Sequence, residues 1–198
     1  VLGGTLAYGG TSQNAVNANT YTIVPSGLTS GNYTITYGNG TLTVNKAALT
    51  VTANADSKTY GSVKTYGSGS TAFTSSGLVN SETIGSVTIT DTNSGGVATA
   101  SAGGTYALTP SAATGGTFNT NNYTITYSTG TLTVNKAALT VTAANASKTY
   151  DGQAYTGGNG VTYSGFVNSE TSSVLGGTLA YGGTSQNAVN ANTYTIVP

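Results

Sequence analysis

The stretch TLTVNKAALTVTA decides the fold, and it occurs twice, at residues 41–53 and at residues 131–143. Leucine and valine alternate with threonine on both sides of an Asn-Lys-Ala-Ala join. Alternation with a period of two is typical of β-strands that have one apolar face. The join has no glycine or proline to make a turn. We therefore expect it to lead almost directly from the last strand of one module into the first strand of the next, as a short and stiff connection.

The repetition extends in both directions from this stretch. Residues 1–25 return letter for letter as residues 174–198, and residues 32–61 return with few changes as residues 122–151. Self-similarity at a fixed spacing indicates an array of modules. The end copies are not atypical, as capping repeats usually are, so we expect the chain to be a piece of a longer array.

The repeat predicts three parts. We expect the C-terminal part of one repeat module at residues 1–46, a complete module at residues 47–136 and the N-terminal part of the next module at residues 137–198. Within the complete module we expect strands near residues 47–53, 70–74, 84–91, 96–101, 104–108, 122–127 and 130–135.

The composition predicts an all-β fold. Threonine and tyrosine favour strands, while the 29 glycines, with asparagine and serine, favour turns. Short strands with frequent turn signals predict tandem immunoglobulin-like antiparallel β-sandwich modules. The alternative is a parallel β-helix, which normally shows a coil period of about 20 residues. No such subperiod is visible.

The segment Asn-Tyr-Thr-Ile-Thr-Tyr gives the clearest strand pattern. Tyr33 and Tyr37 share one face of a strand with Ile35, and Tyr123 and Tyr127 repeat the pattern in the second copy. Their alignment with isoleucine predicts that these tyrosines belong to the core. A short glycine turn leads from each strand into TLTV, so we expect a β-hairpin here.

Charge and residue chemistry exclude several functions. Five basic residues balance five acids, and nucleic-acid binding needs a basic stripe, so we expect no nucleic-acid partner. No stretch approaches the roughly 18 apolar residues of a membrane span. Histidine and cysteine are absent, and no nucleophile–base–orienter set can be assembled. We expect no enzyme activity, no catalytic residue, no metal and no cofactor.

Three motifs together resemble a known family. They are the Asn-Tyr-Thr-Ile-Thr-Tyr strand, the Lys-Ala-Ala-Leu-Thr-Val-Thr join, and Ser-Lys-Thr-Tyr followed by glycine after Tyr60 or by the run Tyr150-Asp151-Gly152. The set resembles the MBG and YDG repeat domains of large bacterial surface proteins, including filamentous-haemagglutinin-like adhesins. The resemblance implies a β-sandwich module, an extracellular place at the bacterial cell surface, secreted or associated with the outer membrane, and a role as stalk or matrix component.

Lysines and acids recur at equivalent places. Lys58 and Lys148 occupy the same motif, and Glu82 and Glu170 follow the same Val-Asn-Ser sequence. A lone acid repeated in every module is odd for an active site, so we expect structural Lys–acid pairs, each worth under about 1 kcal/mol at a surface. A covalent bond between lysine and asparagine or aspartate, assisted by the acid, is the alternative.

The partners follow from the array. The first expected partners are neighbouring modules of the same chain. The expected function is a structural stalk, spacer or fibre-forming segment. Self-association into fibres is a second reading, because low charge protects strand edges poorly. In the alternative function, the repeats bind host or matrix glycans through many weak contacts, and exposed tyrosines in a groove would favour it.

Overall fold

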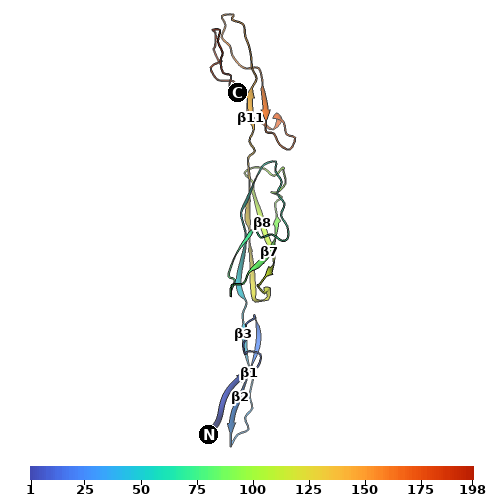
Figure 1. The fold of residues 1–198 in the computed structure, drawn as a ribbon, viewed down its shortest axis with the longest axis vertical. Coiled ribbons are helices and arrows are strands. Elements are labelled where there is room, and N and C mark those ends of the chain that lie inside the picture. Colours follow the sequence, from blue (N-terminus) through green and yellow to red (C-terminus); the bar gives the residue numbers. More distant parts are fainter. The chain divides into compact units, whose positions relative to one another are not determined.

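The computed structural model describes residues 1–198 as an all-β chain with two short 3₁₀ turns. No helix in it has the length and apolar character that crossing a membrane requires. Residues 1–46 form one antiparallel sheet in the order β1-β2-β3, drawn in blue in Figure 1. Its strands are β1 (Leu2–Gly9), β2 (Asn19–Ser30) and β3 (Gly40–Val44).

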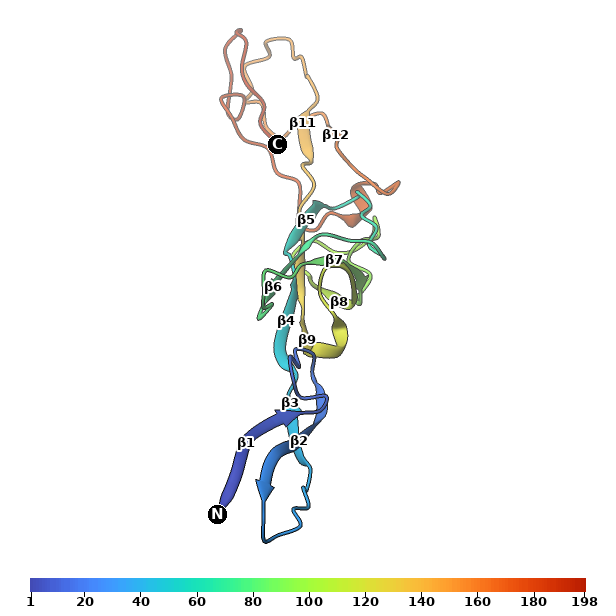
Figure 2. The ribbon, with the colours of Figure 1, turned by 60° about the horizontal axis from the view of Figure 1, so that its bottom comes forward.

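Residues 47–136 form two sheets, in the orders β6-β4-β9 and β5-β10-β8-β7 (Figure 2). Their elements are β4 (Ala47–Ala53), β5 (Asp56–Thr59), β6 (Phe73–Ser76), β7 (Ile84–Asp91), β8 (Thr105–Gly116), the 3₁₀ turn η1 (Thr120–Asn122), β9 (Tyr123–Ser128) and β10 (Gly130–Asn135).

Residues 137–198 contain β11 (Thr140–Ala143), β12 (Val161–Ser164) and the 3₁₀ turn η2 (Ser172–Val174). The β11–β12 pair repeats the register of the β4–β6 pair in the complete repeat. Thr140 lies opposite Ser164, as Thr50 lies opposite Ser76. The Thr-Val-Thr-Ala segment that β4 and β11 share therefore makes the same local strand pairing in both copies.

The core lies in the complete repeat, and its strands alternate as the sequence predicts. In β4, Leu49, Val51 and Ala53 are buried while the threonines between them are partly exposed. Both sheets contribute such a buried face. The buried apolar side chains are Leu49, Val51, Ala53, Val87, Ile89, Ala100, Leu108, Ala113, Tyr123, Leu132 and Val134.

Two strand pairs correct the expectation of purely antiparallel sheets. β4 pairs parallel with β9, and β5 pairs parallel with β10. In both pairs the first strands of the repeat run in the same direction as its last strands. This direction delivers the chain to the end of the repeat opposite its start, where the next repeat begins. The parallel β-helix does not form either, because β1–β2, β2–β3 and β7–β8 are antiparallel.

The expected hairpin is wrong in both copies. β9 belongs to the sheet with β4, whereas β10 belongs to the sheet with β5 and β8. Thr129 alone separates them, so the chain crosses from one sheet to the other at this point. A Cβ atom on Gly130 would lie 2.5 Å from the carbonyl oxygen of Ala53, which shows how closely the crossing passes β4. In the first copy, residues 33–39 form no strand.

Individual strands were predicted with mixed success. The strands at residues 47–53 and 84–91 are confirmed as β4 and β7. The strand expected at residues 96–101 is wrong, because this segment forms turns. β5 was not expected, because Asp-Ser-Lys-Thr has no apolar alternation, and it forms through pairing with β10.

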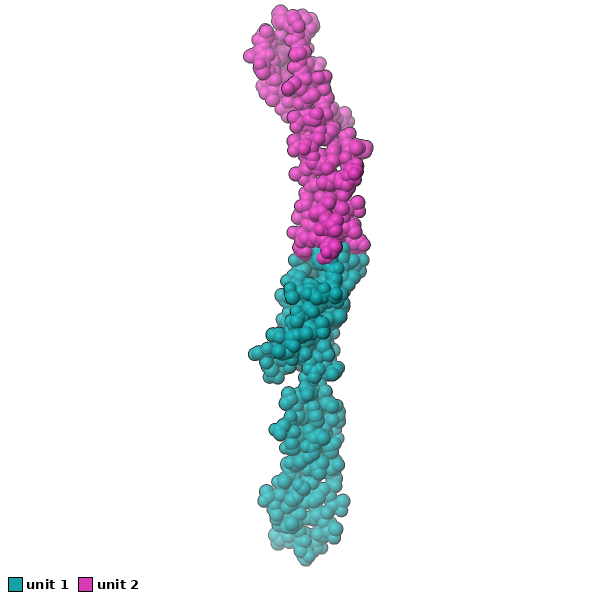
Figure 3. Space-filling view, turned by 45° about the vertical axis from the view of Figure 1, so that its right-hand side comes forward, with its two compact units in different colours: residues 1–55, 66–92, 107–131 teal, residues 56–65, 93–106, 132–198 magenta.

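The chain divides into two compact units, coloured teal and magenta in Figure 3. The first contains residues 1–55, 66–92 and 107–131, and the second contains residues 56–65, 93–106 and 132–198. The units cut through the complete repeat. Each unit therefore contains residues from two successive repeats.

Candidate functional site

The sequence Val-Asn-Ser-Glu forms the same tight turn at residues 79–82 and 167–170. In each copy the glutamate N–H donates to the valine carbonyl oxygen at 3.0 Å. The two central residues are left-handed in both copies, with φ of 53° at Asn80, 56° at Ser81, 53° at Asn168 and 60° at Ser169. Two successive positive φ angles define a type I′ turn. The turn fixes where the glutamate side chain begins.

In the complete repeat this turn holds a buried tyrosine. The Tyr123 hydroxyl donates to Glu82 Oε2 at 2.5 Å and accepts from the Val79 N–H at 3.1 Å. Tyr123 is only 2% exposed, so the prediction of a core tyrosine is confirmed here. The bond to the Glu82 carboxylate raises the pKa of Tyr123 above its ordinary value, because ionisation would lose this hydrogen bond.

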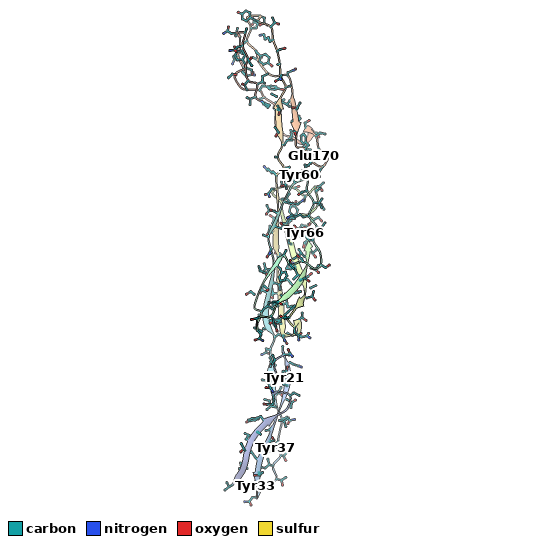
Figure 4. All side chains as sticks on the ribbon, viewed as in Figure 1. Tyr21, Tyr33, Tyr37, Tyr60, Tyr66 and Glu170 are labelled. Atoms are coloured by element: carbon teal, nitrogen blue, oxygen red, sulfur yellow. The ribbon has the colours of Figure 1, made fainter.

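In the last repeat the turn reaches back to the repeat before it. The Tyr60 hydroxyl, from the complete repeat, donates to Glu170 Oε1 at 2.5 Å, and the two residues lie side by side in Figure 4. The Glu170 carboxylate raises the pKa of Tyr60 for the same reason. All of these atoms belong to the second compact unit.

Further contacts surround Tyr60. The Gly61 N–H and the Asn168 side-chain amide both donate to the Ala98 carbonyl oxygen, at 3.0 and 3.2 Å. Gly61 has φ of +90°, and a Cβ atom there would lie 2.7 Å from the Val167 side chain. The Tyr-Gly pair of the first copy thus needs glycine for its backbone and for the close approach of the next repeat.

The earlier join has its own hydrogen bonds, within the first unit. The Asn122 side chain accepts from the Ala18 N–H at 2.9 Å and donates to Asn17 Oδ1 at 2.9 Å. Asn122 directly precedes Tyr123, the partner of Glu82. Asn122 and the Glu82 turn therefore lie together, where residues 1–46 meet the complete repeat.

The predicted lysines and acids do not meet at these joins. Lys58 is 5% exposed, and its ammonium group donates to the carbonyl oxygens of Ser62 and Val97 at 2.9 and 2.5 Å. An exposed ion pair joins Lys64 to Asp56 at 2.5 Å. The structure thus places Lys58 on backbone carbonyls and the repeated glutamates on tyrosines.

The second copy of the lysine motif is arranged differently. Lys148 lies 2.8 Å from Asp151 and also donates to the Gln153 carbonyl oxygen. The hydrogen bond from Lys148 lowers the pKa of the Asp151 carboxyl. Tyr150 is 63% exposed, and Gly152 has φ of +74°.

A cavity of about 290 Å³ lies in the last segment. One wall contains residues 146–149, the copy of β5, and the other contains residues 192–196, which are identical to 19–23 in β2. In their other copies these walls pair with a TLTV strand: β5 with β10, and β2 with β3. The cavity therefore marks the place that β10 fills in the complete repeat, and its tyrosines line that place.

Sequence reasoning found the repeated acids but paired them with lysine instead of tyrosine. The signal was present, because Tyr60 and Glu170 both stand in motifs that occur twice. Sequence alone gave no distance between these motifs. The roles of Asn122 and Asn168 were missed, since single asparagines in an asparagine-rich chain carry no pattern.

The comparisons with known proteins give one match. No curated protein and no solved structure matches the chain. The family described as MBG domain (YGX type) matches residues 1–43, 49–133 and 139–198, which is nearly the whole chain. Tyr60-Gly61 supplies a Tyr-Gly pair within the second matched range, and Tyr150-Asp151-Gly152 departs from it in the third. The chain belongs to the MBG domain family, as successive repeats of that domain.

Proposed function

We propose that the chain is a structural stalk, spacer or fibre-forming segment of a bacterial extracellular adhesin-like protein, and that it carries out no catalysis. Successive MBG domains set length and stiffness. The observation that carries this proposal is the hydrogen bond from Tyr60 in one repeat to Glu170 in the next. A contact of this kind gives the repeated glutamate a part in the connection between repeats, which supports a structural role for it.

The joins support a stiff array. β3 ends at Val44 and β4 begins at Ala47, so two residues connect the first two repeats. β10 ends at Asn135 and β11 begins at Thr140, so the second connection is also short. Short connections without glycine limit bending, and the side-chain hydrogen bonds at both joins limit it further.

We infer that each complete module is an immunoglobulin-like β-sandwich. The support is that both sheets of the complete repeat contribute buried side chains in alternation, as in Leu49 and Val51 of one sheet and Leu132 and Val134 of the other. Two facing sheets bury one face each and leave the other face polar. The threonine-rich outer faces would keep such a module in solution at very low charge.

An extracellular place at the bacterial surface agrees with the resemblance to surface-protein repeats. The glycan-binding alternative has no comparable support. The tyrosines that line the cavity, Tyr150, Tyr155 and Tyr194, surround the place that a β-strand fills in the complete repeat. Because β10 fills the corresponding place in the complete repeat, the cavity does not favour glycan binding over the structural role.

Solution scattering with light-scattering mass tests the proposed function. We would measure arrays of increasing repeat number, built from this sequence. The stalk predicts a monomer whose maximum dimension grows linearly with the number of repeats. A mass that grows with protein concentration would show that the segment self-associates, and it would support the fibre-forming role over the monomeric stalk. A compact monomer whose dimension does not follow repeat number would overturn the proposal.

A further inference from the structure

We propose that the glutamate of each Val-Asn-Ser-Glu turn binds two tyrosines at once, one from its own repeat and one from the repeat before it. The first begins the Asn-Tyr-Thr-Ile-Thr-Tyr strand, and the second ends the Ser-Lys-Thr-Tyr motif. The resulting Tyr–Glu–Tyr contact is the fastening between neighbouring repeats. This inference rests on the proposed function, since it explains how an array would resist bending.

Each half of the contact occurs in the structure, in a different copy of the turn. Glu82 binds the tyrosine of its own repeat, Tyr123, through Oε2. Glu170 binds the tyrosine of the preceding repeat, Tyr60, through Oε1. An ionised carboxylate has two oxygens and about four acceptor sites, so the two bonds do not compete.

The two turns are built alike, which allows the halves to be combined. Both are type I′ turns, both close with a 3.0 Å hydrogen bond from the glutamate N–H, and their central φ angles differ by only a few degrees. The glutamate backbone therefore starts from the same position in each repeat. A partner seen at one copy is within reach of the other copy when the corresponding tyrosine is present.

The exposure of the tyrosines follows the presence of the turn. Tyr123 is 2% exposed beside Glu82, whereas its copy Tyr33 is 74% exposed. Tyr60 is half-buried beside Glu170, whereas its copy Tyr150 is 63% exposed. Identical motifs thus differ in burial according to whether the structure supplies a Val-Asn-Ser-Glu turn next to them.

The chemistry favours tyrosine over lysine at this place. A tyrosine hydroxyl donates one directed hydrogen bond to a carboxylate, and a charge-assisted bond of this kind is stronger than one between neutral groups. Two donors, one from each repeat, restrict both the position and the plane of the carboxylate. Twisting one repeat against the next would have to break at least one of the two bonds.

Two surfaces of the chain follow from this arrangement. The surface around Tyr150 is a docking site for the Val-Asn-Ser-Glu turn of a following MBG domain. The Glu82 turn, through its second oxygen, is a docking site for the Ser-Lys-Thr-Tyr motif of a preceding MBG domain. The partner is in both cases another repeat of the same kind, and no foreign ligand is needed.

A tandem chain makes the complete contact testable. Residues 1–173 followed by residues 1–198 create a seam that already exists in the sequence, because residues 174–198 are identical to residues 1–25. In this tandem, Tyr150 of the first copy faces Glu82 of the second copy, which also holds its own Tyr123. Tyr33 of the second copy likewise joins Tyr60 of the first copy at Glu170 of the first copy.

The decisive measurement is a pH titration of ¹³Cζ-labelled tyrosines by NMR in the tandem. Glu82→Gln in the second copy should return two tyrosines to their ordinary pKa, Tyr123 of that copy and Tyr150 of the first copy. Glutamine has nearly the same shape as glutamate, which keeps the fold. If only one tyrosine responds, the two-tyrosine contact is wrong.

The single chain of 198 residues provides matched controls. Glu170→Gln should lower the raised pKa of Tyr60 and leave Tyr123 unchanged, and Glu82→Gln should do the reverse. Each variant thus checks that the response is local. A response of both tyrosines to either variant would indicate a general loss of structure and would overturn the assignment.

A distance measurement between spin labels separates this inference from the proposed function. Ser57 and Thr178 are exposed on either side of the second join, and the chain has no native cysteine, so Ser57→Cys and Thr178→Cys accept spin labels. Tyr60→Phe and Glu170→Gln should each broaden the label distance distribution, and the double variant should broaden it no further. Unchanged widths, with scattering that still shows a growing rod, would reject the fastening and leave the stalk intact.

Discussion

Tyr60 makes the second join sensitive to pH at the scale of one residue. Its pKa is raised in the folded chain by the hydrogen bond to Glu170. A raised pKa contributes stability below the unfolded value, about 10 for tyrosine, and this stability is lost as pH rises through the folded value. The stability difference between the chain and Tyr60→Phe should be constant at neutral pH and vanish in strong alkali. Urea unfolding at a series of pH values measures it, and a difference that persists at high pH would contradict this origin.

Lys58 is the charged side chain that is buried, so its substitution should lower the free energy of unfolding. Its ammonium group donates to the backbone carbonyl oxygens of Ser62 and Val97. Lys58→Ala removes both hydrogen bonds, and a hydrogen bond to a charged group contributes about 1.5–3 kcal/mol. We expect a loss of about this size in the free energy of unfolding.

Lys148 is the matched control for this substitution, because it has the same motif in a more exposed place. Lys148→Ala should cost less than about 1 kcal/mol, as exposed ion pairs do. Equal losses for the two variants, measured by urea unfolding, would show that burial of Lys58 does not matter.

The sequence predicts which tyrosines follow a strand pattern, but it does not predict which of them are buried. The alternation of Tyr33 with Ile35 is the same as that of Tyr123 with Ile125, and the sequence placed both tyrosines in the core. Only Tyr123 is buried. Its burial depends on β4 and the Glu82 turn, which are far away in sequence, and a local pattern contains no information about such partners.

At the scale of elements, the type I′ turn stores strain that glycine would relieve. A residue other than glycine in the left-handed region costs roughly 1–2 kcal/mol, less for asparagine. Ser81→Gly should therefore raise the free energy of unfolding, by under about 1 kcal/mol once the entropy of glycine is counted. Ser75→Gly, on the exposed face of β6, is the control and should lower it by about 0.5–1 kcal/mol. A destabilised Ser81→Gly in thermal unfolding would mean that the serine side chain, and not the backbone, makes the turn.

The crossing from β9 to β10 depends on one glycine. A Cβ atom on Gly130 would lie 2.5 Å from the Ala53 carbonyl oxygen and 2.6 Å from that of Asn54. Gly130→Ala must push the backbone apart and should cost about 1–3 kcal/mol, as other overpacked sites do. Gly40 is its copy, where a Cβ atom would lie 3.6 Å from Ile23 in ordinary contact. Gly40→Ala should be tolerated, and equal effects in chemical unfolding would contradict the crossing.

The same crossing shows where element prediction from sequence stopped. Alternation identified β9 and β10 as strands within one or two residues, and the glycine identified a sharp change of direction. A change of direction is compatible with a hairpin and with a move to another sheet. The choice depends on β4 and β5, which pair in parallel with β9 and β10, so it is decided by tertiary pairing.

At the scale of the whole molecule, the repeats are similar in sequence, but only residues 47–136 contain every strand of a repeat. Leu132 and Val134 are buried between partners in the complete repeat, while the identical Leu42 and Val44 of β3 are only half-buried. The repeat itself, the all-β class and the joins could be read from the sequence. The Tyr–Glu contacts could not be read from it, because each joins two motifs that lie far apart in the sequence, 41 residues for Tyr123 and Glu82 and 110 residues for Tyr60 and Glu170.

The cavity in the last segment leads to a prediction about the array as a whole. Residues 26–46, placed directly after Pro198, continue the repeat as residues 26–46 follow Pro25 in the first copy. Their TLTV strand should enter between residues 146–149 and 192–196, as β10 does between β5 and β8. Val141 and Lys148 should then become protected, as Val51 and Lys58 are in the complete repeat.

Hydrogen exchange on the extended chain measures this completion, with slowed amides expected in residues 140–149 and a higher thermal midpoint for the last repeat. An extension of the same length with Leu and Val of TLTV changed to Ser is the matched control, because it keeps the backbone donors but removes the apolar face. Protection by both extensions would show that backbone pairing alone closes the repeat. Protection by the native extension alone would show that each MBG domain is closed by the two apolar side chains of its last strand, so that a repeat becomes stiff only when the strand leading to the next repeat is in place.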